Sequence, residues 1–479
     1  MSFIRYKKLN GKLYAYEILA YWDKEQKRSR QKSIYLGRVD EATNQIIGKL
    51  IKTPKGQEKL ILDFGDGYFL NELIKGSNLY PILKAQLFDH HPELVPLIIY
   101  RICTGSAMYN CQNWLEGNVL NVLFKNPNLS SQRISELLVF LGDERVQRNF
   151  FTEYLKLIGG SNKSVIIDAT SLPNQIDIDF NAWGYADGRI DKQFKLLCAV
   201  DQDTKLPLFY RFLPGNISDV TTLKTTMNEL ESMGVKNSLA FLDAGYFSKA
   251  NISDLYERKI NFLTRLPANL TLYKEVVLQQ TREIESLSNA QTSGNRNIFT
   301  KEVKVDLFGN EGYAYMILDP QRKGKEINEL LAKVQQEKID DPTAYNEKKY
   351  ELAFATCGVF ILVSSIPIPV NDVLSCYHIR MYVEQIFRFS KTDLDLLPIR
   401  HHNDDTVRGY LFLQFLQLIL FIQAREKIHK KYTVEQAIMT LQKLKCKVFD
   451  KEVFPQEVSK EQRDILDRYQ IIVPIKLGI

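Results

Sequence analysis

The chain has 479 residues, 45% of them hydrophobic and 25% charged, so it can bury a large core and is not disordered. Its net charge of +6 permits binding to nucleic acid but does not establish it. Its six cysteines include no CxxC pair, which argues against a disulfide framework or a zinc ribbon and favours the cytoplasm. The longest apolar run, residues 411–422, is too short to span a membrane and predicts a core helix.

The N-terminal region, residues 1–60, alternates apolar and polar residues between Phe3 and Gly37, which predicts a β-hairpin with a basic tip. Arg28, Arg30 and Lys32 lie at this tip and could contact DNA phosphates. Cations also protect the exposed edge of a hairpin from pairing with other chains. The sequence favours neither interpretation over the other.

Residues 61–160 have apolar side chains at helical spacing and predict a helical region, which we expect to bind DNA. From Ser164 the pattern changes to short apolar strands. VIIDATS is an apolar run that ends in Asp168, and SLAFLDAGY ends in the same way at Asp243. The order of three strands, a helix, a strand, a helix and a strand predicts an α/β domain with a mixed sheet.

Between residues 267 and 357 the chain has extended segments, YKEVVLQQ, IFTKEVKVDLF and YAYMILD, followed by a charged helix. This stretch predicts a β-rich insertion subdomain. The apolar strand GVFILVSS then resumes the sheet, so the mixed-sheet domain is expected at 161–266 and 358–425. Residues 426–479 predict a C-terminal helical region.

A helix is predicted over residues 376–391, CYHIRMYVEQIFRFSK. At about 100° per residue, one polar stripe covers roughly one-sixth of its circumference, and the apolar side chains lie opposite. The stripe consists of Tyr377, Arg380, Glu384 and Lys391. It presents one carboxylate between cations, which suits a metal ion and a phosphate backbone. A solvated helix face has the same appearance.

A single aspartate after a strand is commonly a turn residue. The combination of Asp168, Asp243 and Glu384 suggests a functional site instead. Carboxylates that converge without histidine or cysteine make an oxygen-only site, which suits Mg²⁺ or Mn²⁺ and disfavours zinc. Two such ions about 4 Å apart can stabilise the attacking and leaving oxygens of phosphoryl transfer. Arg380 and Lys391 would then hold nearby phosphates.

These motifs resemble those of DDE transposases from bacterial insertion sequences. The spacing of Tyr377, Arg380, Glu384 and Lys391 matches the family's YREK signature, and the segments around Asp168 and Asp243 resemble its first and second acidic motifs. PGNISD resembles a segment that lies between them. The resemblance covers residues 3–425. The second motif departs from the common Asp-Arg-Gly-Tyr, because Ala244 replaces the arginine.

The resemblance implies a ribonuclease H-like catalytic core in which Asp168, Asp243 and Glu384 bind two Mg²⁺ ions, with Mn²⁺ as a possible substitute. It implies metal-dependent cleavage and strand transfer at terminal inverted repeats, through a DNA hairpin by analogy. Tyr377, Arg380 and Lys391 would contact DNA phosphates. The partners would be the transposon ends and target DNA, bound by a homodimer that pairs the two ends, with no membrane involved.

Three further residues are candidate DNA contacts. Trp183 could stack on a displaced base, although a tryptophan packed within a loop would look the same in the sequence. His401 and His402 follow the predicted site helix and could contact phosphates or serve a structural role. Two alternatives to an active transposase stay open: a DNA-binding protein that has lost catalysis, and a host nuclease on the same fold.

Overall fold

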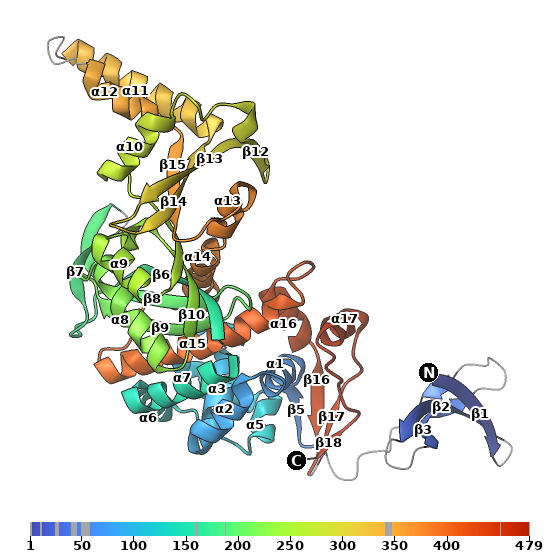
Figure 1. The fold of residues 1–479 in the computed structure, drawn as a ribbon. Coiled ribbons are helices and arrows are strands. Elements are labelled where there is room, and N and C mark those ends of the chain that lie inside the picture. The colour runs from blue at the N-terminus through green and yellow to red at the C-terminus, as the bar shows by residue number, and fades with distance from the viewer. Residues whose placement is uncertain are drawn as a thin grey trace. The chain divides into compact units, whose positions relative to one another are not determined.

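The computed structural model describes residues 2–9, 12–23, 28–39, 46–48, 58–158, 161–186, 188–340, 347–450 and 452–478. The chain forms two compact units, whose elements are labelled in Figure 1. The smaller unit contains Met1–Leu62, Lys445–Glu457 and Val473–Ile479, and the larger contains Asp63–Leu444 and Val458–Ile472. All three acids of the predicted site belong to the larger unit.

A ten-stranded mixed sheet forms the centre of the larger unit. Its strands are β6 (Ser161–Pro173), β7 (Ala182–Ala186), β8 (Arg189–Asp201), β9 (Pro207–Pro214), β10 (Lys236–Leu242), β11 (Asn261–Arg265), β12 (Ala290–Ser293), β13 (Arg296–Asp306), β14 (Glu311–Leu318) and β15 (Val359–Ser364). Their order is β12-β13-β14-β15-β11-β10-β6-β8-β7, and β9 also pairs with β8.

Five of these strands have the topology of a ribonuclease H-like core, which confirms the predicted fold class. β6, β8 and β9 pair antiparallel in succession, and β10 and then β11 join the other side of β6 in parallel. Two helices fill the connections, α8 (Asp219–Ser232) between β9 and β10 and α9 (Lys249–Glu257) between β10 and β11. The predicted order of three strands, helix, strand, helix and strand is therefore confirmed for these elements, but the short strand β7 between β6 and β8 was not predicted.

The central strand β6 is buried because both of its neighbours are in place. Val165, Ile166 and Ile167 are 0% exposed, as expected for a strand in the middle of a sheet. The strand does not end at Asp168, however. Its pairing with β8 continues to Pro173, so the prediction that Asp168 lies at the exit of the strand is wrong. The carboxylate projects from the middle of a strand that β8 pairs as far as Pro173, whereas β10 pairs with the other side only as far as Ile167.

The apolar run 411–422 lies within helix α15 (Asp404–Glu426), which confirms the predicted core helix. The helix is long and apolar enough to cross a membrane, but 83% of its most apolar window is buried inside the protein. It packs closely on α6 (Ser131–Gly142), because Gly409 and Gly142 leave space at the crossing. A Cβ at Gly409 would lie 1.8 Å from the Leu138 carbonyl oxygen, so no larger residue fits there.

The predicted helical region is confirmed. Besides α6 it contains α1 (Gly65–Lys75), α2 (Leu79–Gln86), α3 (His91–Thr104), α4 (Cys111–Glu116), α5 (Val119–Leu123) and α7 (Glu144–Ile158). The aromatic rings of Phe150 and Phe151 on α7 pack edge to face against Phe412 of α15. These contacts join the helical region to the core helix.

Among the described residues of 267–357, helical residues outnumber strand residues, so the prediction of a β-rich insertion is wrong. IFTKEVKVDLF and YAYMILD form β13 and β14 as predicted, and the charged segment forms α11 (Pro320–Asp340), followed by α12 (Glu347–Thr356). The segment YKEVVLQQ is not extended. It lies within helix α10 (Thr271–Gln280), which buries Tyr273, Val276 and Val277. Moreover, β14 pairs with β15, so these strands extend the central sheet.

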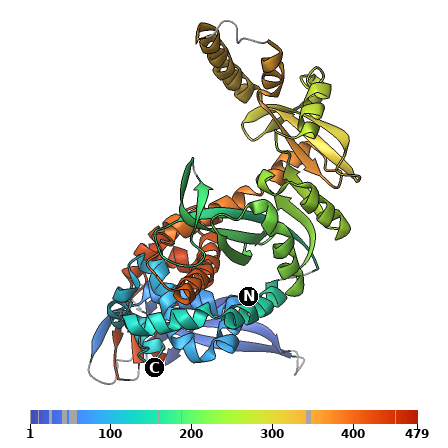
Figure 2. The same cartoon turned by 90° about the vertical axis from the view of Figure 1, so that its left-hand side faces the viewer.

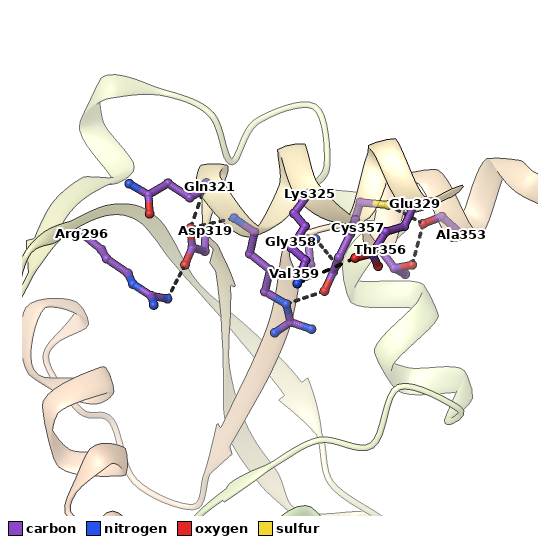
Figure 3. A network of polar contacts seen from close by, with 12 residues as sticks. Arg296, Asp319, Gln321, Lys325, Glu329, Ala353, Thr356, Cys357, Gly358 and Val359 are labelled. Atoms are coloured by element: carbon purple, nitrogen blue, oxygen red, sulfur yellow. Dashed lines mark hydrogen bonds and ion pairs between the residues drawn. The ribbon is translucent and has the colours of Figure 1, made fainter. Parts of the chain in front are cut away.

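The start of α11 is fixed by one buried carboxylate. Asp319 accepts hydrogen bonds from the backbone N–H of Gln321 and Arg322 at 2.9 and 3.2 Å, which satisfies two donors of the first helical turn (Figure 3). Its other oxygen pairs with Arg296 of β13 at 3.0 Å. The charged helix is thereby attached to strand β13 of the sheet.

The smaller unit contains two four-stranded sheets. One is formed by β1 (Ser2–Leu9), β2 (Lys12–Asp23), β3 (Arg28–Val39) and β4 (Ile46–Gly48), which confirms the predicted hairpin. The other contains β5 (Leu60–Asp63), β16 (Lys445–Val448), β17 (Glu452–Pro455) and β18 (Leu477–Gly478). The C-terminal region is therefore not purely helical as predicted, although α16 (Val434–Gln442) and α17 (Lys460–Arg468) are present.

Candidate active site

Two neighbouring strands bring the two aspartates to the same level of the sheet. β10 runs parallel to β6, with Leu242 opposite Ile167, and Asp168 and Asp243 are the next residues of these strands. Asp243 directly follows β10, as predicted, and precedes a 3-10 turn at Ala244–Tyr246. The parallel pairing therefore places both carboxyl groups side by side.

The segment that carries the third acid is not one continuous helix. It consists of α13 (Val370–His378), α14 (Met381–Arg388) and a π-helical turn at Phe389–Asp393, so the prediction of one helix over 376–391 is wrong. Ile379 and Arg380 form the break between α13 and α14. Glu384 lies in the first turns of α14, and Lys391 lies on the π-helical turn.

One guanidinium contacts all three acids. Arg380 Nη1 lies 2.9 Å from Asp168 Oδ2, and Nη2 lies 2.9 Å from Glu384 Oε1. The same Nη2 lies 3.8 Å from Asp243 Oδ1. The Tyr377 hydroxyl also reaches Asp243 Oδ1, at 3.4 Å. Three carboxylates from distant parts of the sequence thus converge on one positive charge.

Burial determines the electrostatics of this cluster. The Asp168 side chain is 15% exposed, and burial raises the pKa of this carboxyl to about 7, although the Arg380 cation and the Ala169 N–H limit the rise. The nearby Asp243 and Glu384 carboxylates raise it further. Burial likewise raises the pKa of Tyr377 to about 12, so its phenol is protonated at neutral pH. The site therefore favours added positive charge.

The donor set fits a hard divalent cation, although Arg380 now contacts the carboxylates. Within the described ranges, no group of three Asp, Glu, His or Cys side chains is arranged to hold a metal ion as it stands. The three side chains that contact Arg380 nonetheless all carry carboxylates, the ligands that Mg²⁺ and Mn²⁺ prefer. Asp168, Asp243 and Glu384 could hold such an ion once the guanidinium moves aside.

A family model described as "Transposase DDE domain" matches residues 160–420, which is more than half of the chain and includes all three acids. The chain belongs to this family of DDE transposases. A solved structure of a piggyBac transposase synaptic complex with hairpin DNA is similar at 11% sequence identity, with a TM-score of 0.40 and coverage of 79% of each chain. A comparison with curated proteins found no match.

The family assignment makes the chain an enzyme, a DNA transposase. Transposases of this family act on DNA and use divalent metal ions. The residues on which the resemblance rested lie together in the structure: Tyr377, Arg380 and Glu384 surround the two aspartates. Lys391 of the transposase lies beside them, with its Nζ 2.8 Å from Thr170 Oγ1 and 3.1 Å from the Ser171 carbonyl oxygen on β6.

Two groups near the cluster were not assigned a role from the sequence. Asp219, in the segment PGNISD, begins α8 and pairs with Lys195 of β8 at 2.9 Å. Tyr246, the tyrosine of the second acidic motif, is 1% exposed. Burial raises its pKa well above the usual range, and the Asp219 and Asp168 carboxylates add to this effect. Both residues lie in quoted motifs, but only the fold brings them near the acids.

The structure describes only some of the remaining residues that were predicted to contact DNA. The hairpin tip, residues 24–27, and the side chains of Arg28, Arg30 and Lys32 lie outside the described part of the chain. Trp183 is not packed within a loop: it lies on strand β7 and is 63% exposed.

The two histidines also differ from each other. His401 packs on the Tyr410 ring, with 5.1 Å between ring centroids, and burial lowers its pKa. His402 is exposed. The contact with Tyr410 supports the structural alternative for His401, whereas exposure leaves His402 accessible to a phosphate.

Proposed function

We propose that this transposase excises an insertion sequence at its terminal inverted repeats and joins the released ends to target DNA. Water would first attack a phosphodiester at the transposon end, which leaves a 3′-hydroxyl and a 5′-phosphate. The 3′-hydroxyl would then attack a phosphodiester of the target and displace its 3′ oxygen. The observation that carries the proposal is the meeting of Asp168, Asp243 and Glu384 at one cation.

The physiological metal would be Mg²⁺, with two ions held by Asp168, Asp243 and Glu384, and Mn²⁺ could replace it. When bound, these ions would supply the positive charge that stabilises the attacking and leaving oxygens of phosphoryl transfer. The all-carboxylate donor set supports this choice over zinc, which prefers histidine and cysteine ligands.

The chain's own cations would hold the DNA backbone beside the acids. Arg380 can bind a phosphate through its planar fork, and Lys391 can bind one as a point charge. The Tyr377 hydroxyl can donate a hydrogen bond to a third phosphate oxygen. Because Arg380 contacts three carboxylates, an incoming phosphate would compete with them for the guanidinium. DNA binding would thereby free the carboxylates for metal ions.

The substrate would be double-stranded DNA, namely the transposon ends and the target. Two ends must be brought together for paired cleavage, so we expect a homodimer in the complex with DNA. We expect the protein in the cytoplasm, associated with the nucleoid when it is bound to DNA. Helix α15, which is long and apolar enough to cross a membrane, is mostly buried inside the protein.

The test is cleavage of a linear duplex that contains the transposon end, whose inverted repeat is read from DNA flanking the gene. The wild-type protein should cut in Mg²⁺ or Mn²⁺ and not in EDTA. Asp243→Asn should bind the duplex but not cut it, because a neutral amide cannot neutralise divalent cations. Asp203→Asn is the matched control, since Asp203 is exposed in the turn after β8. Normal cleavage by Asp243→Asn would overturn the proposal.

The two alternatives give different results in the same experiment. A catalytically silent relative would bind the transposon end and leave it uncut in either metal. A host nuclease would cut the duplex but would not join it to a supercoiled target plasmid. Strand joining by the wild-type protein therefore distinguishes a transposase from both.

A further inference from the structure

One face of the hairpin formed by β7 and β8 exposes large apolar side chains. Trp183, Tyr185 and Ile190 are 63%, 72% and 69% exposed. The strand register pairs Trp183 with Lys192 and Tyr185 with Ile190, so these four residues lie on the same face. β7 is the last strand of the sheet, and Figures 1 and 2 show it at the free edge. We call this surface the hairpin face.

The hairpin face lies on the same side of the sheet as Asp168. Asp168 pairs with Cys198 of β8, and side chains alternate along a strand, so Cys198 and Lys192 point to the same side. Thr170, which contacts Lys391, also points to this side, because it lies two residues from Asp168 on β6. The two strands therefore place Cys198 beside the acids and Lys192 at the hairpin face on one side of the sheet, although Leu172 and Phe194 between them are buried.

The distance from the acids to the hairpin face can be expressed as a number of nucleotides. Six residues separate Cys198 from Lys192 on β8. At about 3.3 Å per residue, this distance is roughly 20 Å. One DNA strand rises about 3.4 Å per nucleotide, so a strand that begins at the acids would reach the hairpin face after about six nucleotides.

The chemistry of the hairpin face fits DNA. Among its four residues there is one cation, Lys192, and no carboxylate, because Asp191 points to the opposite side of β8. Tryptophan and tyrosine rings stack on bases of any sequence, and cations beside them hold the backbone. The strand is also held firmly, because a Cβ at Gly184 would lie 2.3 Å from the Gly215 carbonyl oxygen, so the two backbones are in close contact. The rings thus project from a fixed strand into solvent.

We propose that Trp183 and Tyr185 stack on unpaired DNA bases about six nucleotides from the cleaved phosphate, while Lys192 contacts the backbone there. The assignment rests on the proposed function, since Asp168 marks the position of the cleaved phosphate. It adds a second DNA contact that is separate from the metal and phosphate groups. Such a contact would hold the strand in register and stabilise locally opened DNA beside the cut.

The proposal is tested by binding in EDTA, so that no cleavage occurs. The affinity of a fluorescent duplex containing the transposon end is measured for wild type and for a Trp183→Ala, Tyr185→Ala double variant. Each ring that stacks on a base should contribute about fivefold or more to affinity. The Trp183→Phe, Tyr185→Phe variant keeps both rings and should bind within about twofold of wild type. Leu287→Ala, which removes a 91% exposed apolar side chain elsewhere in the same unit, should bind like wild type.

An abasic scan locates the contact on the DNA. A single base is removed at each of the positions four to eight nucleotides from the cleavage site, on either strand and on either side of the cut. Wild type should lose affinity at one or two of these positions. The alanine variant should lose no further affinity there, because the rings that contact the base are already absent.

The outcomes are decisive in both directions. Equal affinity of the alanine variant and wild type, or a flat abasic scan, would overturn the proposal. A protein partner on this face would also overturn it, and would appear as a change in the sedimentation of the DNA-free alanine variant. Failure of the wild type to cut DNA in Mg²⁺ would contradict the proposed function. The affinities of the variants could still be compared in that case, because they are measured in EDTA without cleavage.

Discussion

The centre of the sheet and its free edge hold their side chains in opposite ways. At the centre, Asp168 is 15% exposed and is fixed by Arg380 and by the Ala169 N–H. At the edge, Trp183 and Tyr185 are 63% and 72% exposed on a strand whose backbone is held by close packing. Chemistry on phosphates needs desolvated charges in a fixed arrangement, whereas contact with bases needs accessible rings. Substitutions at the centre should therefore alter chemistry and electrostatics, and removal of the exposed rings at the edge should alter DNA affinity alone.

The largest effect is expected at the centre. Glu384→Gln keeps the size of the side chain but removes one of the three charges that meet at Arg380. Cleavage of the transposon-end duplex in Mg²⁺ should fall by about 10³-fold or more, because groups that act as a unit fail together. DNA affinity, measured by fluorescence anisotropy, should change less than about threefold. Cleavage within about tenfold of wild type would place Glu384 outside the site.

The next effect is on the pH dependence of stability. The pKa of Asp168 is raised from 3.8 to about 7, so folding favours its protonated form. The stabilising contribution of this group is present below the unfolded-state pKa and is lost as pH rises to about 7. Asp168→Asn cannot ionise, so its stability relative to wild type should increase between pH 4 and pH 8 by up to about 4 kcal/mol.

This difference is measured by urea unfolding in EDTA at the two pH values. A relative stability that stays constant between pH 4 and pH 8 would contradict the raised pKa. A relative stability that falls with pH would show that the Arg380 cation outweighs burial and holds Asp168 ionised.

A smaller effect is expected in the backbone of the edge strand. Gly184→Ala would bring a methyl group within 2.3 Å of the Gly215 carbonyl oxygen, so β7 must shift. Thermal unfolding should show a loss of about 1–3 kcal/mol, and DNA affinity should fall as it does when the rings are removed. Gly324→Ala on α11 is the matched control, since nothing lies within 4 Å of its added Cβ. It should be neutral or stabilise by up to about 1 kcal/mol. Equal stability of both variants would contradict the close packing of β7.

The smallest effect separates the two regions most sharply. Trp183→Ala should change the free energy of unfolding by less than about 0.5 kcal/mol, because the ring makes little contact with the fold. Its rate of cleavage at saturating DNA should match wild type. A large loss of stability would mean that the ring packs against the protein, and a loss of rate at saturation would place it in the chemistry.

Much of the centre could be predicted from the sequence, because local patterns determine it. The apolar runs before Asp168 and Asp243 predicted the two strands that carry them, and the i, i+4 spacing of Arg380 and Glu384 is that of an ion pair on a helix. The contact of Arg380 with Asp168 spans 212 positions of sequence, so no local pattern could reveal it. The helical periodicity also predicts in which direction each side chain points around the axis, but it does not show whether the helix is interrupted. The break at Ile379 and Arg380 could therefore not be predicted.

Other errors arose where tertiary contacts override local preference. The run that contains Val276 and Val277 has the composition of a strand, but helix α10 buries both residues against its neighbours, including β14. Asp168 appeared to end its strand, because a sequence does not show that β8 continues to supply partners as far as Pro173. Tyr185 was overlooked for a similar reason: only the register with β8 places it beside Trp183 and Ile190 on one face.

The central claim is that Asp168, Asp243 and Glu384 form a single divalent-metal site. It can be tested most directly with Fe²⁺ in place of Mg²⁺, since ascorbate and peroxide then generate radicals that cut the backbone next to the bound ion. In the complex with DNA, the cuts should cluster near residues 168, 243 and 384, disappear with excess Mg²⁺, and be lost at all three places in Glu384→Gln. Cuts at only one of the three segments, or cuts that persist in Glu384→Gln, would contradict the account.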